Sequence, residues 1–380
     1  MSTPPSFQSF TTSRGARVFA IPVEAFPNFF AYAYLVQTGG MLTLIDTGSG
    51  SERSHASLEA GFEQAGAALG IPVTFADLTH ILITHGHIDH FGGLVRLREL
   101  TTARVGIHEL DVQTVTHHEV RLAVMGRRLD AFLEQSGVGA EARRDLLRMY
   151  RFTKAVYHSV PVDFTFEAAD MAIGPFEMIH VPGHCPGHVA IRLDDVIFCG
   201  DLVIEKVTPH QSPEELTPFM GLRHYLEALS NFRRWADGAR LVLSGHDAPI
   251  PDLNARIADI RENLAHRLHQ TLDGFAEPNT VAEVCKQVYG EIGGYNSLLV
   301  LEKMGAYVEY LYQRGLLEIS NLNELEGDGQ FPSPTGRGAR GEGAGGEGAG
   351  GEGAPVIRYR CSHLVPDMEL LPKERAYVLV

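Results

Sequence analysis

The residues of this chain that are best suited to chemistry stand close together. His85, His87 and His90 supply three imidazoles, and Asp89 supplies a carboxylate among them. They follow the apolar run 81–83, which is typical of a buried strand, so the cluster should lie at the end of a strand. Imidazole ligands suit zinc, iron or nickel, and a carboxylate ligand extends the choice to manganese. The pattern therefore predicts a metal site at the end of a strand.

Further ligand-type residues follow predicted strands elsewhere in the chain. His184 stands in a Pro-Gly-His sequence and Asp201 in Gly-Asp. His246 stands in Gly-His, and Asp46 stands in Asp-Thr-Gly. Loops that leave the same edge of a layered sheet can bring such residues together. We therefore expect them to converge on the cluster at 85–90.

The elements that must position these residues alternate between strands and helices, which is typical of a layered α/β fold. Strand-like runs are predicted at 18–23, 30–36, 41–45, 81–83, 103–107, 176–181, 189–193, 196–199 and 241–243. Helical spacing is predicted at 57–69, 225–235, 257–275, 281–289 and 298–312, and on both sides of 137–139. Gly39-Gly40 predicts a hairpin turn.

In this order, the motifs resemble those of the metallo-β-lactamase superfamily, from about Val18 to Pro249. The resemblance implies the family's αβ/βα fold, a four-layer sandwich of two mixed sheets flanked by helices. It also implies two divalent metal ions. Zinc is the first choice, with iron or manganese as alternatives, because these ligand types discriminate poorly between metals.

The resemblance also implies a role for each ligand-type residue. The first ligand set would be His85, His87 and His184. The second would be Asp89, His90 and His246. Asp201 would be the carboxylate that bridges the two ions. Asp46 would orient the ligand loop from outside the metal ligands. His188, which ends the sequence Pro-Gly-His-Cys-Pro-Gly-His, is interpreted as a residue that fixes its loop rather than as a ligand.

The chemistry of such a site is hydrolytic. Two metal ions about 3.5–4 Å apart can lower the pKa of a shared water toward neutrality and polarise a carbonyl or phosphoryl oxygen. Asp89 could hold the attacking water or accept its proton, and Asp201 would hold both metal ions, so these two are the candidate catalytic residues.

The composition narrows the classes of partner. The chain has 380 residues and a formal net charge of −15, so binding to nucleic acid would need a local basic groove. Its four cysteines are far apart and form no Cys-x-x-Cys pair, which favours a reducing compartment. No apolar run near the start is long enough to cross a bilayer. We expect a cytoplasmic protein with no membrane partner.

The organisation along the chain predicts four parts. Residues 1–250 would form the metallo-β-lactamase domain, with a helical insertion at 109–157 that could cap the site, form a homodimer surface or simply pack. Residues 251–320 resemble a small winged-helix module, as in the β-lactamase-like protein two group. Residues 321–355 include a Gly-Glu-Gly-Ala-Gly repeat and are predicted to be a disordered linker, and 356–380 is a tail of unknown role.

Several functions remain open for this site. The first is hydrolysis of an acyl ester or thioester of a small molecule or a carrier-bound substrate, which the acidic composition favours. A glyoxalase II-like hydrolysis of hydroxyacyl thioesters is a close alternative, and cleavage of single-stranded RNA is another, which the acidic composition disfavours. A non-catalytic binding module that kept only the fold is disfavoured, because both sets of metal ligands are complete. An oxygen-using iron enzyme of the same fold is a further alternative. Its flavin-coupled diiron version is disfavoured, because such proteins typically have an acidic residue where this chain has His87.

Overall fold

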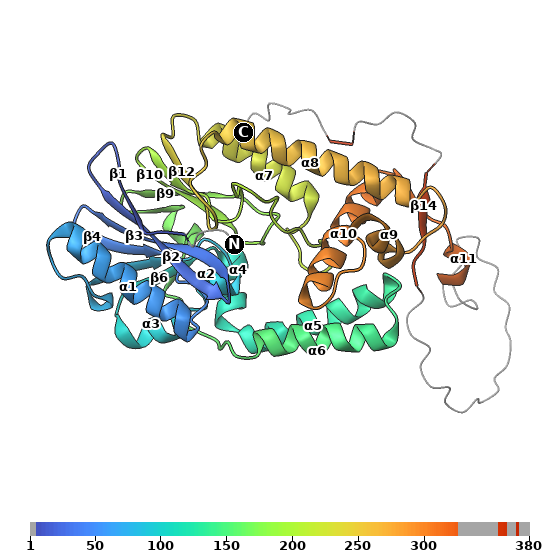
Figure 1. The fold of residues 1–380 in the computed structure, drawn as a ribbon, viewed down its shortest axis with the longest axis horizontal. Coiled ribbons are helices and arrows are strands. Elements are labelled where there is room, and N and C mark those ends of the chain that lie inside the picture. Colours follow the sequence, from blue (N-terminus) through green and yellow to red (C-terminus); the bar gives the residue numbers. More distant parts are fainter. Residues whose placement is uncertain (1–4, 326–355, 363–369, 372–380) are drawn as a thin grey trace.

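The computed structural model describes residues 5–325, 356–362 and 370–371. Two large sheets form its centre (Figure 1). The first contains seven strands in sequence order: β1 Gln8–Thr11, β2 Arg17–Phe26, β3 Phe29–Thr38, β4 Met41–Ile45, β5 His80–Leu82, β6 Arg104–Ile107 and β7 Phe164–Thr165. Strands β1 to β4 pair antiparallel, and β4 to β7 pair parallel. Thr38 pairs with Met41, so the predicted Gly-Gly hairpin is confirmed.

The second sheet contains five strands in the order β12-β11-β10-β9-β8. They are β8 Ala172–Ile173, β9 Phe176–His180, β10 Val189–Leu193, β11 Val196–Phe198 and β12 Leu241–Leu243. Neighbours pair antiparallel except β11 and β12, which are parallel. The ends of β11 and β12 therefore point the same way, which brings the segments after Phe198 and Leu243 to one edge.

The central strands of the sheets are buried on both faces, whereas the edge strands β1 and β8 have exposed residues. In the first sheet, Leu44 and Ile81 contribute to a cluster that includes residues of the flanking helices, whereas Ile45 and Leu82 face residues of the second sheet such as Phe198. Successive side chains of a strand alternate between faces, so a nearly continuous apolar run buries both. The mixed α/β fold expected from the sequence is therefore confirmed.

Helices cover the outer faces of the sheets. Against the first sheet lie α1 Glu52–Leu69 and α3 Leu94–Leu100, and the short α2 Ile88–Phe91 precedes α3. Against the second lie α7 Leu222–Trp235 and α8 Leu253–Gly274. The side chain of Asp252 accepts a hydrogen bond from the Ala255 N–H and caps α8.

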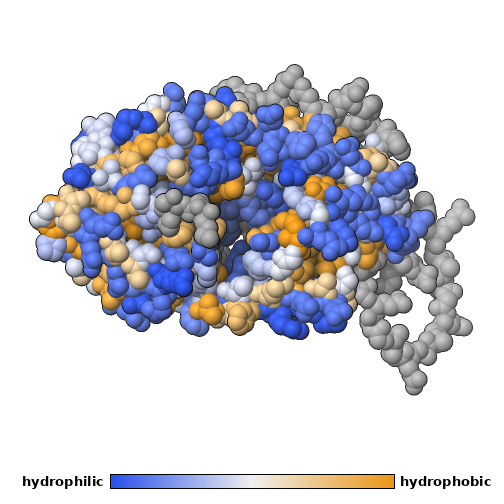
Figure 2. Space-filling view, in the orientation of Figure 1, coloured by the Kyte–Doolittle hydropathy of each residue, from blue (hydrophilic) through white to orange (hydrophobic). Residues whose placement is uncertain are grey.

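The predicted insertion is helical throughout much of its length. It contains α4 Glu109–Thr116, α5 His118–Gln135 and α6 Ala140–Lys154. The two predicted helices on either side of 137–139 are α5 and α6, which pack on each other. Figure 1 shows them along the bottom of the molecule, with α8 along the top and the C-terminal helices between their right-hand ends. Figure 2 shows a hollow on this face, between the two-sheet part and those helices.

The C-terminal part contains α9 Val281–Tyr289, α10 Tyr295–Gln313, β13 Leu317–Ile319 and α11 Leu322–Leu325. Strand β13 pairs antiparallel with β14 Tyr359–Cys361, which belongs to the segment predicted as a tail. The segment predicted to be a disordered linker, 321–355, begins with the short helix α11, and the rest of it, with the Gly/Glu-rich repeat, lies outside the described residues. None of the described helices is both long and apolar enough to cross a membrane.

Candidate metal centre

The loop after β5 is held in place by Asp46, which directly follows β4. The Asp46 carboxylate accepts hydrogen bonds from the backbone N–H and the hydroxyl of Thr84, both at 2.8 Å. Because β4 and β5 are parallel neighbours, Asp46 and Thr84 leave the same edge of the sheet. The loop then enters α2, whose single turn carries Asp89 and His90.

The first predicted ligand set is brought together. Ligand-type atoms of His85, His87 and His184 all lie within 4.8 Å of one another. His85 Nε2 and His87 Nδ1 are 3.0 Å apart. The Nδ1 of His184 lies 2.9 Å from the carbonyl oxygen of His210 and donates to it. That bond leaves Nε2 of His184 free to act as a ligand.

The second predicted set is brought together in the same way. Asp89, His90 and His246 also place ligand-type atoms within 4.8 Å of one another. His246 Nδ1 donates to the carbonyl oxygen of Phe30 at 2.6 Å, and His90 Nδ1 donates to Asp46 at 2.8 Å. Both imidazoles therefore present Nε2 toward the site.

Asp201 lies between the two sets. Its Oδ2 is 3.2 Å from Nε2 of His246 and 3.5 Å from Nε2 of His184, and its Oδ1 is 3.5 Å from Nε2 of His90. A side chain on Gly245 would not fit here, since a Cβ atom would come within 2.1 Å of Asp201 Oδ1. The carboxylate is thus placed to contact ions held by either set.

The charges of the site depend on its burial. Burial lowers the pKa of His85 well below its usual value, and the neighbouring imidazoles lower it further. Burial also opposes the charged form of His90, but Asp201, Asp46 and Asp89 outweigh it and raise the His90 pKa well above normal. For Asp201, burial is outweighed by His246 and His90, which hold its pKa well below normal. The Asp201 carboxylate is therefore ionised at neutral pH.

Several ligand-type atoms lack partners. Nε2 of His90, Nε2 of His184 and Oδ1 of Asp201 are buried without a hydrogen bond. An unpaired buried polar atom costs roughly 1–3 kcal/mol, so such atoms need a partner. Imidazole nitrogens and carboxylate oxygens are the donors that zinc and similar divalent ions accept. The residues present therefore fit two divalent ions, one for each set, with Asp201 in reach of both.

The other predicted residues are placed around these sets. His188 is fully buried and its Nε2 accepts the Asp201 N–H at 3.1 Å, so it fixes the loop that carries Asp201. Cys199 is buried, and its thiol lies 3.4 Å from the carbonyl oxygen of Val203. Neither residue belongs to the two ligand sets.

Sequence reasoning missed Asp111. This fully buried carboxylate on α4 accepts the Gly86 N–H at 2.7 Å, between two histidines of the first set. The Cys185 thiol, next to His184, lies 3.3 Å from the same carboxylate. Burial raises the pKa of Asp111. Asp111 thus joins the two loops that carry the first set, and nothing in the local sequence distinguishes it from an ordinary acid in the first turn of a helix.

Comparison with known proteins gives a family for this geometry. A family model described as "Metallo-beta-lactamase superfamily" matches residues 27–254. A Bacillus subtilis protein named "Probable metallo-hydrolase YqjP" is 22% identical over 299 residues, which cover 73% of this chain and 86% of that protein. A hydroxyacylglutathione hydrolase of Shewanella is 29% identical over 124 residues, which cover 33% of this chain and 34% of that enzyme.

Two solved structures are similar over most of the chain. A beta-lactamase domain protein from Burkholderia ambifaria superposes with a TM-score of 0.68 at 22% identity, and the match covers 95% of this chain and 96% of that one. A metallo-beta-lactamase family protein from Thermus thermophilus superposes with a TM-score of 0.62 at 25% identity, covering 80% of this chain and 96% of that one.

Proposed function

The chain belongs to the metallo-beta-lactamase superfamily, and from this premise we propose that it hydrolyses an acyl ester or thioester with two metal ions. The family and the metallo-hydrolase relatives make it a hydrolase. Our proposal adds the dinuclear centre, the substrate class and the roles of the residues. The substrate would be a small molecule or an acyl group bound to a carrier.

One observation supports the dinuclear centre above others, namely the position of Asp201 between two complete ligand sets. Its carboxylate is within 3.5 Å of an imidazole nitrogen from each set. In this proposal His85, His87 and His184 hold one ion, Asp89, His90 and His246 hold the other, and Asp201 bridges them. Zinc is our first choice, and iron or manganese would suit the same ligands.

When bound, the two ions would supply an activated water and polarise the substrate carbonyl. The protein side chains would do the rest. In this proposal Asp89, whose Oδ2 lies 3.4 Å from Nε2 of His246 at the half-buried edge of the site, would hold the attacking water or accept its proton. Asp46 and Asp111 would keep the ligand loops in place.

The charge of the insertion favours acyl hydrolysis over cleavage of RNA. Its arginines are the densest basic set in the sequence, yet Arg143 pairs with Asp130 at 2.9 Å and with Glu134 at 2.6 Å. Contact with phosphates along a strand needs basic side chains that are not already neutralised. The endoribonuclease stays a weaker alternative.

A glyoxalase II-like reaction is the second candidate, and a specific observation favours it. Hydroxyacylglutathione hydrolases are among the similar proteins, although the match covers only a third of this chain. They act on a thioester, which is the same reaction class as our proposal.

A substrate panel on the metal-loaded full chain tests the proposal. We expect about two metal ions per chain by elemental analysis, and hydrolysis of at least one acyl thioester, hydroxyacyl glutathione or lactone. Replacing Asp201 with Ala should abolish turnover while circular dichroism stays unchanged. Less than one ion per chain after loading with zinc or manganese would overturn the dinuclear centre. Cleavage of single-stranded RNA without any acyl hydrolysis would overturn the substrate class.

Three finer points of organisation are part of the same proposal. The packed sheets and their covering helices support the family's four-layer sandwich. The order α9, α10, β13, followed by the paired strand β14, supports a winged-helix-like module. Residues 275–320 contain three basic and six acidic side chains, and this charge disfavours DNA binding by the module. A cytoplasmic location and a homodimer formed through the insertion remain predictions.

A further inference from the structure

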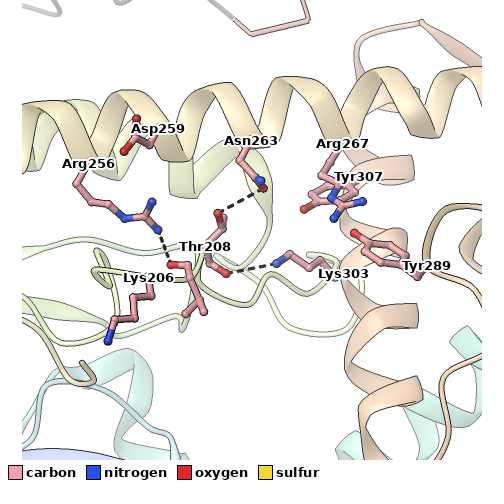
Figure 3. Close-up of a pocket in the computed structure, with 10 residues that line it drawn as sticks. Lys206, Thr208, Arg256, Asp259, Asn263, Arg267, Tyr289, Lys303 and Tyr307 are labelled. Carbon is pink, nitrogen blue, oxygen red and sulfur yellow. Dashed lines mark hydrogen bonds between the residues drawn. The ribbon is translucent and has the colours of Figure 1, made fainter. Parts of the chain in front are cut away.

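A cavity of about 410 Å³ lies between α8, α9, α10 and the loop that follows Asp201. None of the candidate metal ligands lines it. Arg256 and Arg267 reach it from α8, Lys303 and Tyr307 reach it from α10, and Tyr289 reaches it from the end of α9 (Figure 3). Its size is that of a small-molecule site rather than of a packing defect.

Four positive side chains line the cavity, and one of them, the exposed Lys206, lies 3.9 Å from a carboxylate oxygen of Glu205 and of Asp247. The other three are held by groups without a net charge. Arg256 donates to the carbonyl oxygens of Ile204 and Val207, at 2.7 and 2.8 Å. Lys303 donates to the carbonyl oxygen of Thr208 at 3.3 Å. These acceptors orient the cations but carry no net charge.

Arg267 is held in the same way. It donates to the amide oxygen of Gln270 at 2.9 Å and lies 4.9 Å from the centre of the Tyr289 ring. Among the ion pairs found in the described part of the chain, none involves Arg256, Arg267 or Lys303, although Asp259 also lines the cavity. Three half-buried cations from two helices therefore share one cavity without a paired carboxylate.

Burial affects two groups of the cavity, Tyr307 and Lys303. The Tyr307 hydroxyl is fully buried and makes no hydrogen bond within ordinary limits. Burial, followed by the nearby Tyr289, raises the pKa of Tyr307 well above normal, so the hydroxyl keeps its proton and can donate. Burial, followed by repulsion from Arg267, lowers the pKa of Lys303 to about 8. An anion in the cavity would relieve the repulsion between Lys303 and Arg267.

We propose that this cavity binds the phosphate group of a small-molecule ligand. A phosphate has about two negative charges near neutral pH and several acceptor oxygens, so the donors of Arg267 and Lys303, which come from two helices, suit it better than they suit a carboxylate. Arg267 and Lys303 lie close enough for the arginine to repel the charged lysine, and this pair of cations suits a compact anion such as a single phosphate group better than a nucleic-acid strand. The site does not depend on the proposed hydrolysis.

The cavity is connected to the metal centre through the chain. Its wall includes Thr208, and two residues later His210 accepts the hydrogen bond from His184. His210 in turn lies 3.0 Å from Glu302, the neighbour of Lys303 on α10. A bound phosphate would therefore fix the loop that orients one ligand of the first set.

Calorimetric titration of the metal-loaded full chain with inorganic phosphate tests the proposal. We expect Arg267→Gln and Lys303→Met each to weaken phosphate binding by about ten-fold or more, because each removes a charge-assisted hydrogen bond. Arg223→Gln is the matched control, since this exposed arginine on α7 pairs only with Glu227 among the ion partners in the described chain. It should leave the affinity unchanged.

The controls separate this site from the metals. Phosphate bound at the metal ions would be equally strong in all four proteins, so equal affinities, or no binding at millimolar phosphate, would overturn the proposal. Metal content and circular dichroism should match across the variants, and Lys303→Met should fold even if Arg267→Gln does not, because it removes a buried charge.

Steady-state kinetics in the presence of phosphate then distinguish two kinds of natural ligand. Competition with the substrate points to a phosphate-bearing substrate, and a change in kcat alone points to a separate ligand.

Discussion

The His90 imidazole donates from Nδ1 to the Asp46 carboxylate, whose Oδ2 lies 2.8 Å away. Both side chains are buried, with no more than 2% of either exposed. The same carboxylate fixes Thr84 at the start of the ligand loop. One acid thus sets both the position of the loop and the tautomer of a candidate ligand, and such partners commonly matter for metal affinity.

Replacing Asp46 with Asn should weaken metal binding. An amide that still accepts the Thr84 N–H must turn its NH2 group toward His90. His90 would then have to accept at Nδ1 and carry its proton on Nε2, where the metal should bind. We expect a loss of about 10- to 100-fold in affinity for one of the two ions. Titration with zinc, followed by elemental analysis, measures this.

The control for this substitution is Asp170→Asn, at an exposed turn whose backbone has φ of 52°, a conformation that Asn also tolerates. It should bind both ions as the natural protein does. If Asp46→Asn also retained two tightly bound ions, the role given to Asp46 would be wrong.

Replacing Asp111 with Asn should lower both stability and activity. Its carboxylate accepts hydrogen bonds from the Gly86 N–H and from the Cys185 thiol, and an amide would bring a donor to one of these contacts. We expect a loss of about 1–3 kcal/mol in the free energy of unfolding, together with reduced turnover, because the loops of the first set lose a common anchor. Urea unfolding and steady-state kinetics are the measurements.

Glu109→Gln is the matched control, because Glu109 is exposed in the first turn of the same helix. It should change the free energy of unfolding by less than about 0.5 kcal/mol. A stable Asp111→Asn variant with normal turnover would show that the loops hold without this carboxylate.

The sequence predicted the centre of the molecule better than its periphery, for physical reasons. Ligand-type residues such as His85 and Asp201 closely follow buried strands, and parallel neighbours must end at one edge of a sheet. Asp111 follows no such rule, because its role depends on two loops that are distant in sequence. A helix-borne acid of this kind becomes visible only when the chain has folded.

The C-terminal part shows a similar limit. Strand β13 could be anticipated from the apolar residues of 315–319, but its partner β14 lies about forty residues further on. Between them is the Gly/Glu-rich repeat, which hides any short-range signal of pairing. Non-local pairing of a three-residue strand leaves almost no pattern in the sequence.

The buried Lys303 should make stability depend on pH. Its pKa is about 8 in the folded chain, lowered by burial from a usual 10.5. Between these values the unfolded chain binds the proton and the folded chain does not, so stability should rise as pH increases from 8 to 10.5. Below pH 8 the cost of the buried charge is fully present, and it is about 3 kcal/mol.

Lys303→Met should therefore be more stable than the natural protein at pH 7, and this advantage should shrink toward pH 10.5. Urea unfolding at several pH values, in buffers without phosphate, measures this. Equal pH dependence of the two proteins would contradict a lowered Lys303 pKa. Adding phosphate should stabilise the natural protein more than the variant, which links this prediction to the proposed anion site.

Tyr359 should anchor β14 to the C-terminal helices. Its ring lies 6.0 Å from that of Phe275 and 5.8 Å from that of Tyr312, and its backbone exchanges hydrogen bonds with Asn279 at 2.9 and 3.0 Å. Tyr359→Ala should lower the free energy of unfolding by about 1–3 kcal/mol, because it removes ring contacts but keeps the backbone pairing. Arg360→Ala is the control, since Arg360 is exposed on the other face of the strand and pairs with Glu318. It should cost less than about 1 kcal/mol. Comparable losses in the two variants would mean that β14 is held by its backbone alone.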